Sequence, residues 1–385
     1  MSKQLDFKEK LLKRIKRDKK ATPKHVFIAL VVTFLFIAGF EMFYTQPVPE
    51  AESKEDSAFS ASFVGDMMFG RHVLEVTENE GTDFLFENVA PYFQNSDYVT
   101  GNFENAVTLQ EEENYQKLEK SIHLSSDASP VQSLARMNFT NVNLANNHTM
   151  DFGEQGMIET MASLDEAGLP YVGAGQNIEE AQEIDYQEIK GLNVATLGFS
   201  DVPVSGSEAL QFRAGVADAD PEQFLPLVQE ASENADMVFV HIHWGAEYDN
   251  EPHPRQRKLA EAIVDAGADV IIGHHPHVLS PVEVYKDSVI FYSLGNFIFD
   301  QGWSRTRDSA LVNYNLMNDG TGRFEILPMR IREARPALTT NLYNQKKIFL
   351  QLTRGEPEEN FTEENGRLTI EVDHSSILEQ KNNRR

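Results

Sequence analysis

The chain of 385 residues contains no cysteine. This absence excludes disulfide-stabilised folds, thiolate metal sites and cysteine nucleophiles. Any metal ion must therefore be held by His, Asp, Glu or Asn side chains. No long low-complexity tract is present, and a hydrophobic content of 41% with a charged content of 24% is ordinary for a globular protein. The length is sufficient for one large α/β domain with additional segments.

Basic residues are scarce outside the N-terminus. Residues 1–24 carry ten Lys/Arg and three Asp/Glu, whereas residues 25–385 carry 24 basic and 57 acidic residues, a balance of −33. Such an acidic body repels the phosphates of nucleic acids, so the sequence predicts no nucleic-acid partner. A solvated surface suited to strong electrolyte is one interpretation of this acidity. A surface that avoids adhering to a polyanionic product is the functional alternative.

A long apolar run lies near the N-terminus, at residues 26–44, and is interrupted by Thr33 and Glu41. Its nineteen residues span about 28 Å as a helix, close to the hydrocarbon thickness of a bilayer. Basic residues precede the run and acidic residues follow it, so the positive-inside rule places the N-terminus in the cytoplasm. A cleaved signal peptide is the alternative. The long basic region and the lack of a small-x-small cleavage site favour an uncleaved, single-pass anchor in the cell membrane with the large domain outside.

These features divide the chain into five expected segments. They are a basic cytoplasmic segment at 1–24, a transmembrane anchor at 25–45, a polar linker at 46–57, a large domain at 58–335 and a C-terminal extension at 336–385.

Within the large domain, β-rich and helical patterns alternate along the chain. The expected strands are 58–64, 140–144, 194–199, 236–242, 269–272 and 288–293. The clearest helix is 255–266, where apolar residues recur on one face and Gly267 follows. Repeated alternation of this kind predicts an α/β domain with mainly parallel core strands. After about residue 300 the pattern predicts strands without long helices, at 310–316 and 323–327, and a frayed tail at 381–385.

Polar residues suited to metal binding follow these strands. Ligands in α/β sheets gather beyond the carboxyl ends of the strands, so these positions are the first candidates for a site. The residues concerned are Asp66, Arg71, Asn102, Glu104, Asn147, His148, Asp151, His241, His243, His274, His275, His277 and Asn296.

Each of these residues alone has a structural interpretation. A single histidine is often a hydrogen-bonded structural residue, and Asp66 after Gly65 could cap a helix or form a turn. Histidines two apart on a strand point to the same face, which favours the pairs His241/His243 and His275/His277 as ligands. Their joint occurrence at successive strand ends predicts a metal or anion site.

The order and approximate spacing of these motifs, from about residue 60 to 308, resemble the CapA/PgsA family of capsule biosynthesis proteins. The matching segments are Gly65-Asp66-Met67-Met68-Phe69-Gly70-Arg71, Gly101-Asn102-Phe103-Glu104-Asn105, Ala145-Asn146-Asn147-His148, His243-Trp244-Gly245, Gly273-His274-His275-Pro276-His277 and Tyr292-Ser293-Leu294-Gly295-Asn296-Phe297. The basic N-terminus and single anchor also resemble the family members of poly-γ-glutamate producers. The family is similar to the calcineurin-like metallophosphatases.

This resemblance implies an α/β fold of four α-β-β-α layers, preceded by a single transmembrane helix. It also implies a site for one or two divalent metal ions (Mn, Zn, Fe or Mg). The implied metal residues are Asp66, Asn102, Glu104, Asn147, His243, His275 and His277, and the implied catalytic residues are His148 and Arg71.

The match to the metallophosphatase pattern is incomplete at two motifs. Met68 stands where that pattern has a histidine, and a thioether is a poor ligand for hard divalent ions. Asn102 and Glu104 stand where a bridging aspartate is expected, and either His274 or His275 could take the next ligand role.

Three functions remain open at this point. The resemblance implies a membrane-anchored extracytoplasmic subunit of the poly-γ-glutamate synthesis and export complex, which would receive, guide or release the emerging polymer. It also implies a PgsB-type ligase and a PgsC-type membrane protein as partners. The His/Asp/Asn cluster alternatively indicates an active metal-dependent hydrolase, cleaving a phosphoester or an amide bond of the polymer. An adhesion or scaffold domain with a purely structural polar cluster is the third hypothesis.

Overall fold

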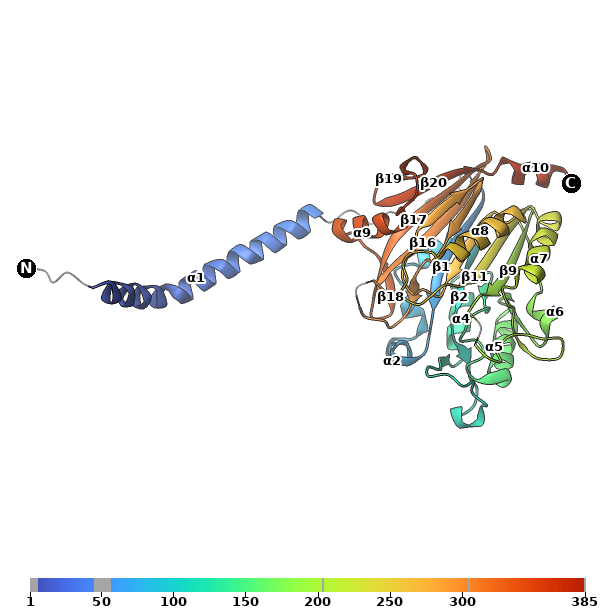
Figure 1. Cartoon of the computed structure of the whole chain (residues 1–385), viewed down its shortest axis with the longest axis horizontal. Coiled ribbons are helices and arrows are strands. Elements are labelled where there is room, and N and C mark those ends of the chain that lie inside the picture. Colours follow the sequence, from blue (N-terminus) through green and yellow to red (C-terminus); the bar gives the residue numbers. More distant parts are fainter. Residues whose placement is uncertain (1–5, 45–56, 203, 304, 384–385) are drawn as a thin grey trace, which may run out of the picture.

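The computed structural model describes residues 6–44, 57–202, 204–303 and 305–383. Helix α1 (Phe7–Tyr44) includes most of the predicted basic segment and nearly all of the predicted anchor (Figure 1). Its stretch Phe7–Gly39 is long and apolar enough to cross a membrane, and the most apolar part of this stretch is not buried against other described residues. This helix is a candidate for the single membrane span. The predicted linker lies outside the described residues, apart from Ser57.

Two large β-sheets form the centre of the body. Among the described residues, the larger sheet has ten strands: β19 (Thr362–Glu364), β20 (Arg367–Asp373), β17 (Thr321–Arg332), β16 (Asp308–Met317), β1 (Ser57–Met67), β2 (Tyr98–Phe103), β5 (Val142–Asn143) and β6 (Tyr171–Val172) in spatial order, with β15 (Asn296–Ile298) beside β1 and β18 (Arg335–Leu338) beside β17. The smaller has the order β13 (Val282–Tyr285), β14 (Ser288–Phe291), β12 (Val270–His274), β11 (Met237–His243), β9 (Leu192–Ser200) and β8 (Asp185–Ile189). Two short pairs, β3 (Ala106–Val107) with β4 (Ser125–Ser126) and β7 (Ala174–Gly175) with β10 (Gly215–Val216), lie outside these sheets.

The two sheets pack face to face through an apolar layer. Phe63 of β1 meets Phe239 of β11 edge-on, with ring centroids 5.1 Å apart. The hydroxyl of Tyr98 on β2 lies 2.7 Å from the hydroxyl of Thr196 on β9. This contact satisfies two polar groups inside the layer, which would otherwise destabilise the fold by being buried without partners.

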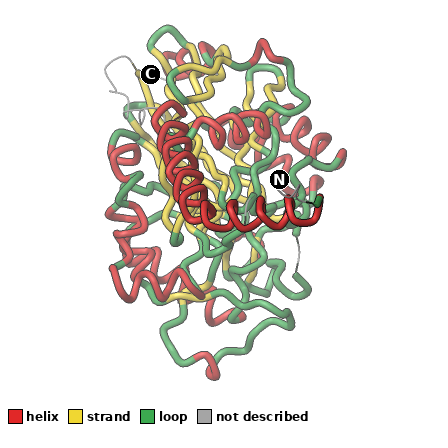
Figure 2. The backbone as a smooth tube through the Cα atoms, turned by 90° about the vertical axis from the view of Figure 1, so that its left-hand side faces the viewer, coloured by secondary structure: helices red, strands yellow, loops and turns green. Residues whose placement is uncertain are grey.

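Helices cover the outer face of each sheet. The chain's helices after α1 are α2 (Arg71–Glu80), α3 (Ala90–Gln94), α4 (Ser129–Arg136), α5 (Gly153–Ala167), α6 (Ile178–Ala181), α7 (Pro221–Asn234), α8 (Pro254–Asp265), α9 (Leu342–Leu352) and α10 (Ser375–Asn383). Apolar residues of α4 and α5 share one buried cluster with the outer side of β1 and β2, and those of α7 and α8 share another with β11 and β12. Figure 2 shows the strands in the middle of the body with helices along its sides. The predicted α-β-β-α fold is therefore confirmed.

The strands predicted from the sequence occur, although their lengths differ. The stretch 140–144 forms only the two-residue strand β5, and 236–242 extends to His243 in β11. The core is parallel from β1 through β2 and β5 to β6, and from β9 through β11 and β12 to β14. The larger sheet continues antiparallel through β16, β17 and β20, so part of the predicted C-terminal extension joins this sheet.

The expectation that no long helix follows residue 300 was wrong. Helix α9 begins where the Asn341 side chain accepts a hydrogen bond from the Asn344 N–H. Its apolar residues Ile348, Phe349 and Leu352 are buried in the cluster between the sheets. The apolar stripe is short and charged residues flank it, so the sequence pattern alone gives a weak helical signal.

Candidate metal centre

Alternation along β11 aims two histidines into the space between the sheets. Met237 and Phe239 belong to the apolar layer between the sheets, and His241 and His243 continue on the same face. Val238 and Val240, on the other face, pack under the helices. Side chains alternate across a strand, so this register follows directly from the sequence. The prediction that His241 and His243 share a face is confirmed.

A break in register turns Asp66 toward this space. Phe63 pairs with Thr100 across β1 and β2, but the next pair is Asp66 with Asn102. Three residues on β1 thus oppose two on β2, as in a β-bulge. Regular alternation from Phe63 would have aimed Gly65 inward and Asp66 outward. The extra residue brings the Asp66 carboxylate beside Asn102.

Asn102 connects the polar residues at the ends of the strands. Its Nδ2 donates to Asp66 Oδ1 at 2.9 Å and to Glu104 Oε2 at 3.1 Å. Its Oδ1 accepts from the amide groups of Asn143 at 3.0 Å and Asn146 at 3.1 Å. In this arrangement Asn102 bridges the two carboxylates through Nδ2. To act as a metal ligand, its side-chain amide would have to rotate so that Oδ1 faces the ion.

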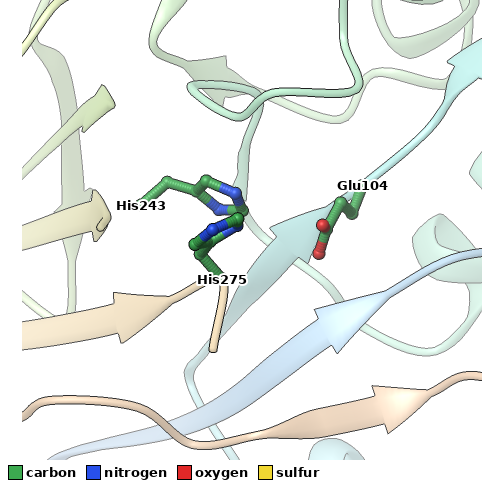
Figure 3. Close-up of side chains that lie close together, drawn as sticks. All are labelled: Glu104, His243 and His275. Atoms are coloured by element: carbon green, nitrogen blue, oxygen red, sulfur yellow. The ribbon is translucent and has the colours of Figure 1, made fainter. Parts of the chain in front are cut away.

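One potential ligand group consists of Glu104, His243 and His275. A ligand atom from each residue lies within 4.8 Å of the others, and all three residues are buried. Figure 3 shows the two imidazoles side by side, opposite the Glu104 carboxylate. The amide oxygen of Asn147 lies 3.0 Å from His243 Nε2. Asn147, which was also predicted as a metal residue, therefore contacts this group through His243.

A second potential group consists of Asp66, Glu104 and His277. His277 Nδ1 lies 3.2 Å from Asp66 Oδ2, and its Nε2 lies 3.7 Å from Glu104 Oε1. The expectation that His275 and His277 lie on a strand was wrong, because β12 ends at His274. Both residues have positive φ angles, 95° and 56°, a backbone conformation that costs energy in non-glycine residues and often marks functional sites.

The donor set fits a divalent cation. Glu104 Oε1 and His275 Nδ1 are buried without a hydrogen-bond partner among the described residues. Unpaired buried polar atoms are costly, and a cation would satisfy them. Carboxylate and imidazole donors suit Mn, Zn and Fe better than soft metals. Mg would rely on the carboxylates alone.

The electrostatics of the centre also favour a bound cation. Burial would raise the pKa of Asp66, but His274 and His277 outweigh this effect and hold the pKa well below its usual range. Burial and the charge of Asp66 raise the pKa of Glu104 well above its usual value. Burial lowers the pKa of His243 strongly and that of His275 to about 3. Neutral imidazoles are the form that binds metals, and a cation would favour ionised Glu104.

His148 is held at the edge of the centre by the buried carboxylate of Asp151. Its Nδ1 lies 2.7 Å from Asp151 Oδ2. Lys120 donates from Nζ to Asp151 Oδ1 and to the carbonyl of Asn147, both at 2.7 Å. Burial lowers the pKa of His148 despite the nearby carboxylate. Lys120 was not predicted from the sequence, because it lies in the loop between β3 and β4 and follows no core strand.

Arg71 lies farther from the ligand groups. It begins α2 with a positive φ of 53°, forms an ion pair with Asp300, and its guanidinium lies 5.6 Å from the ring of Phe299. Phe299 in turn packs on His277, with ring centroids 4.7 Å apart. Arg71 therefore reaches the centre through Phe299, and its predicted catalytic role stays a prediction.

The structure gives different surroundings to His274 and His275. His274 lies between His241 and Asp66, with Nε2 2.9 Å from His241 Nδ1 and Nδ1 3.3 Å from Asp66 Oδ1. His275 faces His243 and Glu104. Met68, where a histidine was expected, accepts the Gly70 N–H through sulfur at 3.0 Å, away from the ligand groups.

Comparison with known proteins identifies close relatives. The family model described as "Bacterial capsule synthesis protein PGA_cap" matches residues 60–301. The "PGA biosynthesis protein CapA" of Bacillus subtilis is 51% identical, over 99% of this chain and 100% of that protein. The "Capsule biosynthesis protein CapA" of Bacillus anthracis is 43% identical, over 100% of this chain and 95% of that protein. A "Probable polyglutamine synthesis accessory protein" of Mycobacterium tuberculosis is 29% identical, over 50% of this chain and 56% of that protein.

Solved structures share only a distant likeness with the chain. A hypothetical protein from Thermus thermophilus has a TM-score of 0.43 and 17% identity, and covers 73% of this chain and 97% of its own. A 5'-nucleotidase precursor from the same organism has a TM-score of 0.41 and 14% identity, and covers 77% of this chain and 59% of its own. Scores this low carry no argument about function.

Proposed function

The chain belongs to the bacterial capsule synthesis protein PGA_cap family, and from this premise we propose that it is a membrane-anchored, extracytoplasmic subunit of the machinery that makes and exports poly-γ-glutamate. The observation that carries the proposal is the 51% identity to a PGA biosynthesis protein along nearly the whole chain. That alignment includes the N-terminal helix as well as the domain.

The proposed topology places residues 1–24 in the cytoplasm and the domain at 58–335 outside. Its support is the charge difference across the apolar run, ten basic residues before it and an acidic body after it. The proposed partners are a ligase of the PgsB type, which would supply the growing polymer, and a membrane protein of the PgsC type. The anchor would hold the domain where the polymer emerges.

The candidate metal centre would serve this function by attracting carboxylates. Glu104, His243 and His275 would hold one divalent cation, and Asp66, His277 and the shared Glu104 a second. A bound divalent ion supplies a concentrated positive charge that attracts anionic oxygens. Asn102 would keep the two carboxylates apart in the correct orientation. His148 would stay neutral beside Asp151.

The same cluster favours a second candidate function, a metal-dependent hydrolase acting on the polymer. His148 lies at the edge of the cluster and could hold or donate a proton at its Nε2 atom, since Nδ1 faces Asp151. The two hypotheses differ in turnover. A hydrolase would shorten purified poly-γ-glutamate, and a subunit without activity would leave its length unchanged.

Complementation tests the proposed function. A Bacillus subtilis strain lacking its CapA relative would receive the full chain or a chain in which residues 1–45 are replaced by a cleavable signal peptide. We expect the full chain to restore polymer production and the chain without an anchor to fail despite equal expression. Co-purification of the ligase and the small membrane subunit with the full chain is expected as well. Failure of the full chain to restore any polymer would contradict the proposal.

Topology can be tested separately on intact protoplasts. Added protease should digest the large domain and spare an N-terminal fragment. Complete protection of the domain would reject the external location, and a mature N-terminus near residue 45 would show a cleaved signal peptide instead of an anchor.

A further inference from the structure

A cavity of about 420 Å³ lies beside helix α9, apart from the metal-ligand groups. Three basic residues, Arg305, Lys347 and Arg354, contribute to its wall. Its apolar part includes the buried Ile348 and Leu350, which is 69% exposed. These five residues follow the segment at 60–301 that the family model matches, whereas Asn250, Val278 and Leu279 of the lining lie within it.

The charge of this cavity is opposite to that of the domain. Asp308 is the acidic residue of the lining, and it pairs with two cations, Lys347 Nζ at 2.5 Å and Arg330 Nη1 at 2.6 Å, so one positive charge remains in excess of this carboxylate. Arg354 pairs with Glu251 at 2.7 Å, but both side chains are about half exposed, so the pair is weak. The lining therefore retains positive charge in a body whose balance from residue 25 onward is −33.

Arg305 is the most available of these cations. Among the described residues, no carboxylate forms an ion pair with it. Its guanidinium lies 5.9 Å from the ring of Trp303, where a cation–π contact holds the side chain without neutralising it. A planar guanidinium of this kind can bind a carboxylate through two parallel hydrogen bonds.

A continuous series of contacts joins the cavity to the metal centre. The ring of Trp303 lies 5.2 Å from that of Tyr248, which lies 6.3 Å from His277. Gln301 donates to the Tyr248 hydroxyl at 3.1 Å. Asn296 donates to the Thr306 carbonyl at 3.2 Å, and its Oδ1 lies 2.9 Å from His277 Nδ1. Trp303 and Thr306, on either side of Arg305, are therefore joined by contacts to the same residues as His277.

We propose that this cavity is a binding site for an anionic polyamide, and that it holds the carboxylates of a glutamyl polymer next to the metal centre. The proposal rests on the proposed function for the identity of the polymer. Arg305, Lys347 and Arg354 contact successive carboxylates, and the apolar wall at Ile348 and Leu350 receives the methylene groups between them. Elsewhere the acidic surface repels the polymer, so the chain is confined to this path.

The test uses the full chain in detergent and a fluorescently labelled poly-γ-glutamate of about ten residues. The variant R305Q/K347Q/R354Q removes the three positive charges and keeps polar, unbranched side chains. A matched control, R136Q/R213Q/K286Q, removes three cations that form surface ion pairs elsewhere. Binding is measured by fluorescence anisotropy from 20 mM to 500 mM salt, and circular dichroism checks that each variant is folded.

We expect the cavity variant to bind the polymer at least tenfold more weakly than the wild type at low salt, with a flatter salt dependence. The control should stay within twofold of the wild type. Equal affinity of the cavity variant and the control would overturn the cavity proposal and leave the proposed function intact. No binding by the wild type at any salt concentration would instead count against direct contact with the polymer. If the triple variant is unfolded, R305Q alone, at an exposed position, should still weaken binding at least threefold, and no change would reject the proposal.

Discussion

The imidazoles of His241 and His274 are stacked, with ring centroids 5.2 Å apart and 14° between their planes, and Nδ1 of His241 lies 2.9 Å from Nε2 of His274. At the other side of His241, the hydroxyl of Thr100 lies 2.9 Å from Nε2. His274 in turn reaches Asp66. Neutral imidazole has one donor and one acceptor nitrogen, so hydrogens directed from Thr100 through His241 to His274 satisfy both nitrogens of His241. His274 Nδ1, which has no hydrogen-bond partner among the described residues, then carries the hydrogen that faces Asp66.

The first prediction concerns Thr100, the first member of this hydrogen-bonded series. Thr100→Val keeps the side-chain volume but removes the hydroxyl, so His241 Nε2 is left buried without a partner. We expect the free energy of unfolding to fall by about 1–3 kcal/mol. Urea denaturation measures the change. Thr100→Ser retains the hydroxyl and should lose clearly less; a Thr100→Val variant as stable as the wild type would show that the hydroxyl contributes nothing.

The second prediction concerns the two ligand groups. His243 belongs to one group and His277 to the other, while Glu104 belongs to both. We expect H243A/H277A to lose all divalent-metal binding with the fold retained, and each single variant to lose one ion. Glu104→Gln should weaken the binding of both ions, by at least tenfold each.

Metal content after dialysis and calorimetric titration with Mn²⁺ would measure these effects. His72→Ala is the control, because this half-exposed histidine lies on α2 and pairs with Glu75 and Glu333. Normal metal content in the double variant would mean that the cluster is purely structural.

Much of the candidate site could be predicted from the sequence. Positions at the ends of successive strands in an α/β pattern must meet at one edge, and alternation along 237–243 determines the direction of His241 and His243. The residues Asp66, Glu104, His243, His275 and His277 do come together.

The remaining features depend on contacts that no local pattern encodes. The bulge between Phe63 and Asp66 changes the direction of Asp66, and periodicity cannot reveal one extra residue. The positive φ angles of His275 and His277 depend on how the following loop packs. Lys120 reaches Asp151 from a loop with no periodic signal.

The third prediction concerns Gly65, next to the bulge. A Cβ atom at this position would lie 1.9 Å from the carbonyl oxygen of Gly295, the same oxygen that accepts the Asp66 N–H at 3.0 Å. Gly65→Ala must therefore separate β1 from β15 and displace Asp66. We expect a loss of stability above about 4 kcal/mol, or failure to fold.

Gly168→Ala provides the comparison for Gly65. Gly168 has a φ of +66°, and a Cβ atom added there would have no described atom within 4 Å, so only backbone strain opposes alanine. We expect a cost of about 1 kcal/mol. Thermal unfolding of both variants would measure the difference, and a Gly65→Ala protein as stable as Gly168→Ala would contradict the close approach of β1 and β15.

The last prediction is a dependence of stability on pH that arises from Asp269. Burial raises the pKa of this carboxyl to about 7, and its Oδ2 accepts the Val238 N–H at 2.7 Å. In the unfolded chain an aspartate has a pKa of about 3.9. Between these values the folded state binds the proton and the unfolded state does not, so the stabilising contribution is complete below about pH 4 and is lost as the pH rises to about 7.

Asp269→Asn cannot titrate, and its amide oxygen can still accept the Val238 N–H. Between pH 4 and pH 8, the free energy of unfolding of the variant should rise by about 1–3 kcal/mol relative to that of the wild type. We expect a value near the lower figure, because the Asp269 side chain is partly exposed. Urea unfolding at pH 4, 6 and 8 measures this gain, with the exposed Asp265→Asn as control. A difference between Asp269→Asn and the wild type that stays constant over this range would show that Asp269 has an ordinary pKa in the folded protein.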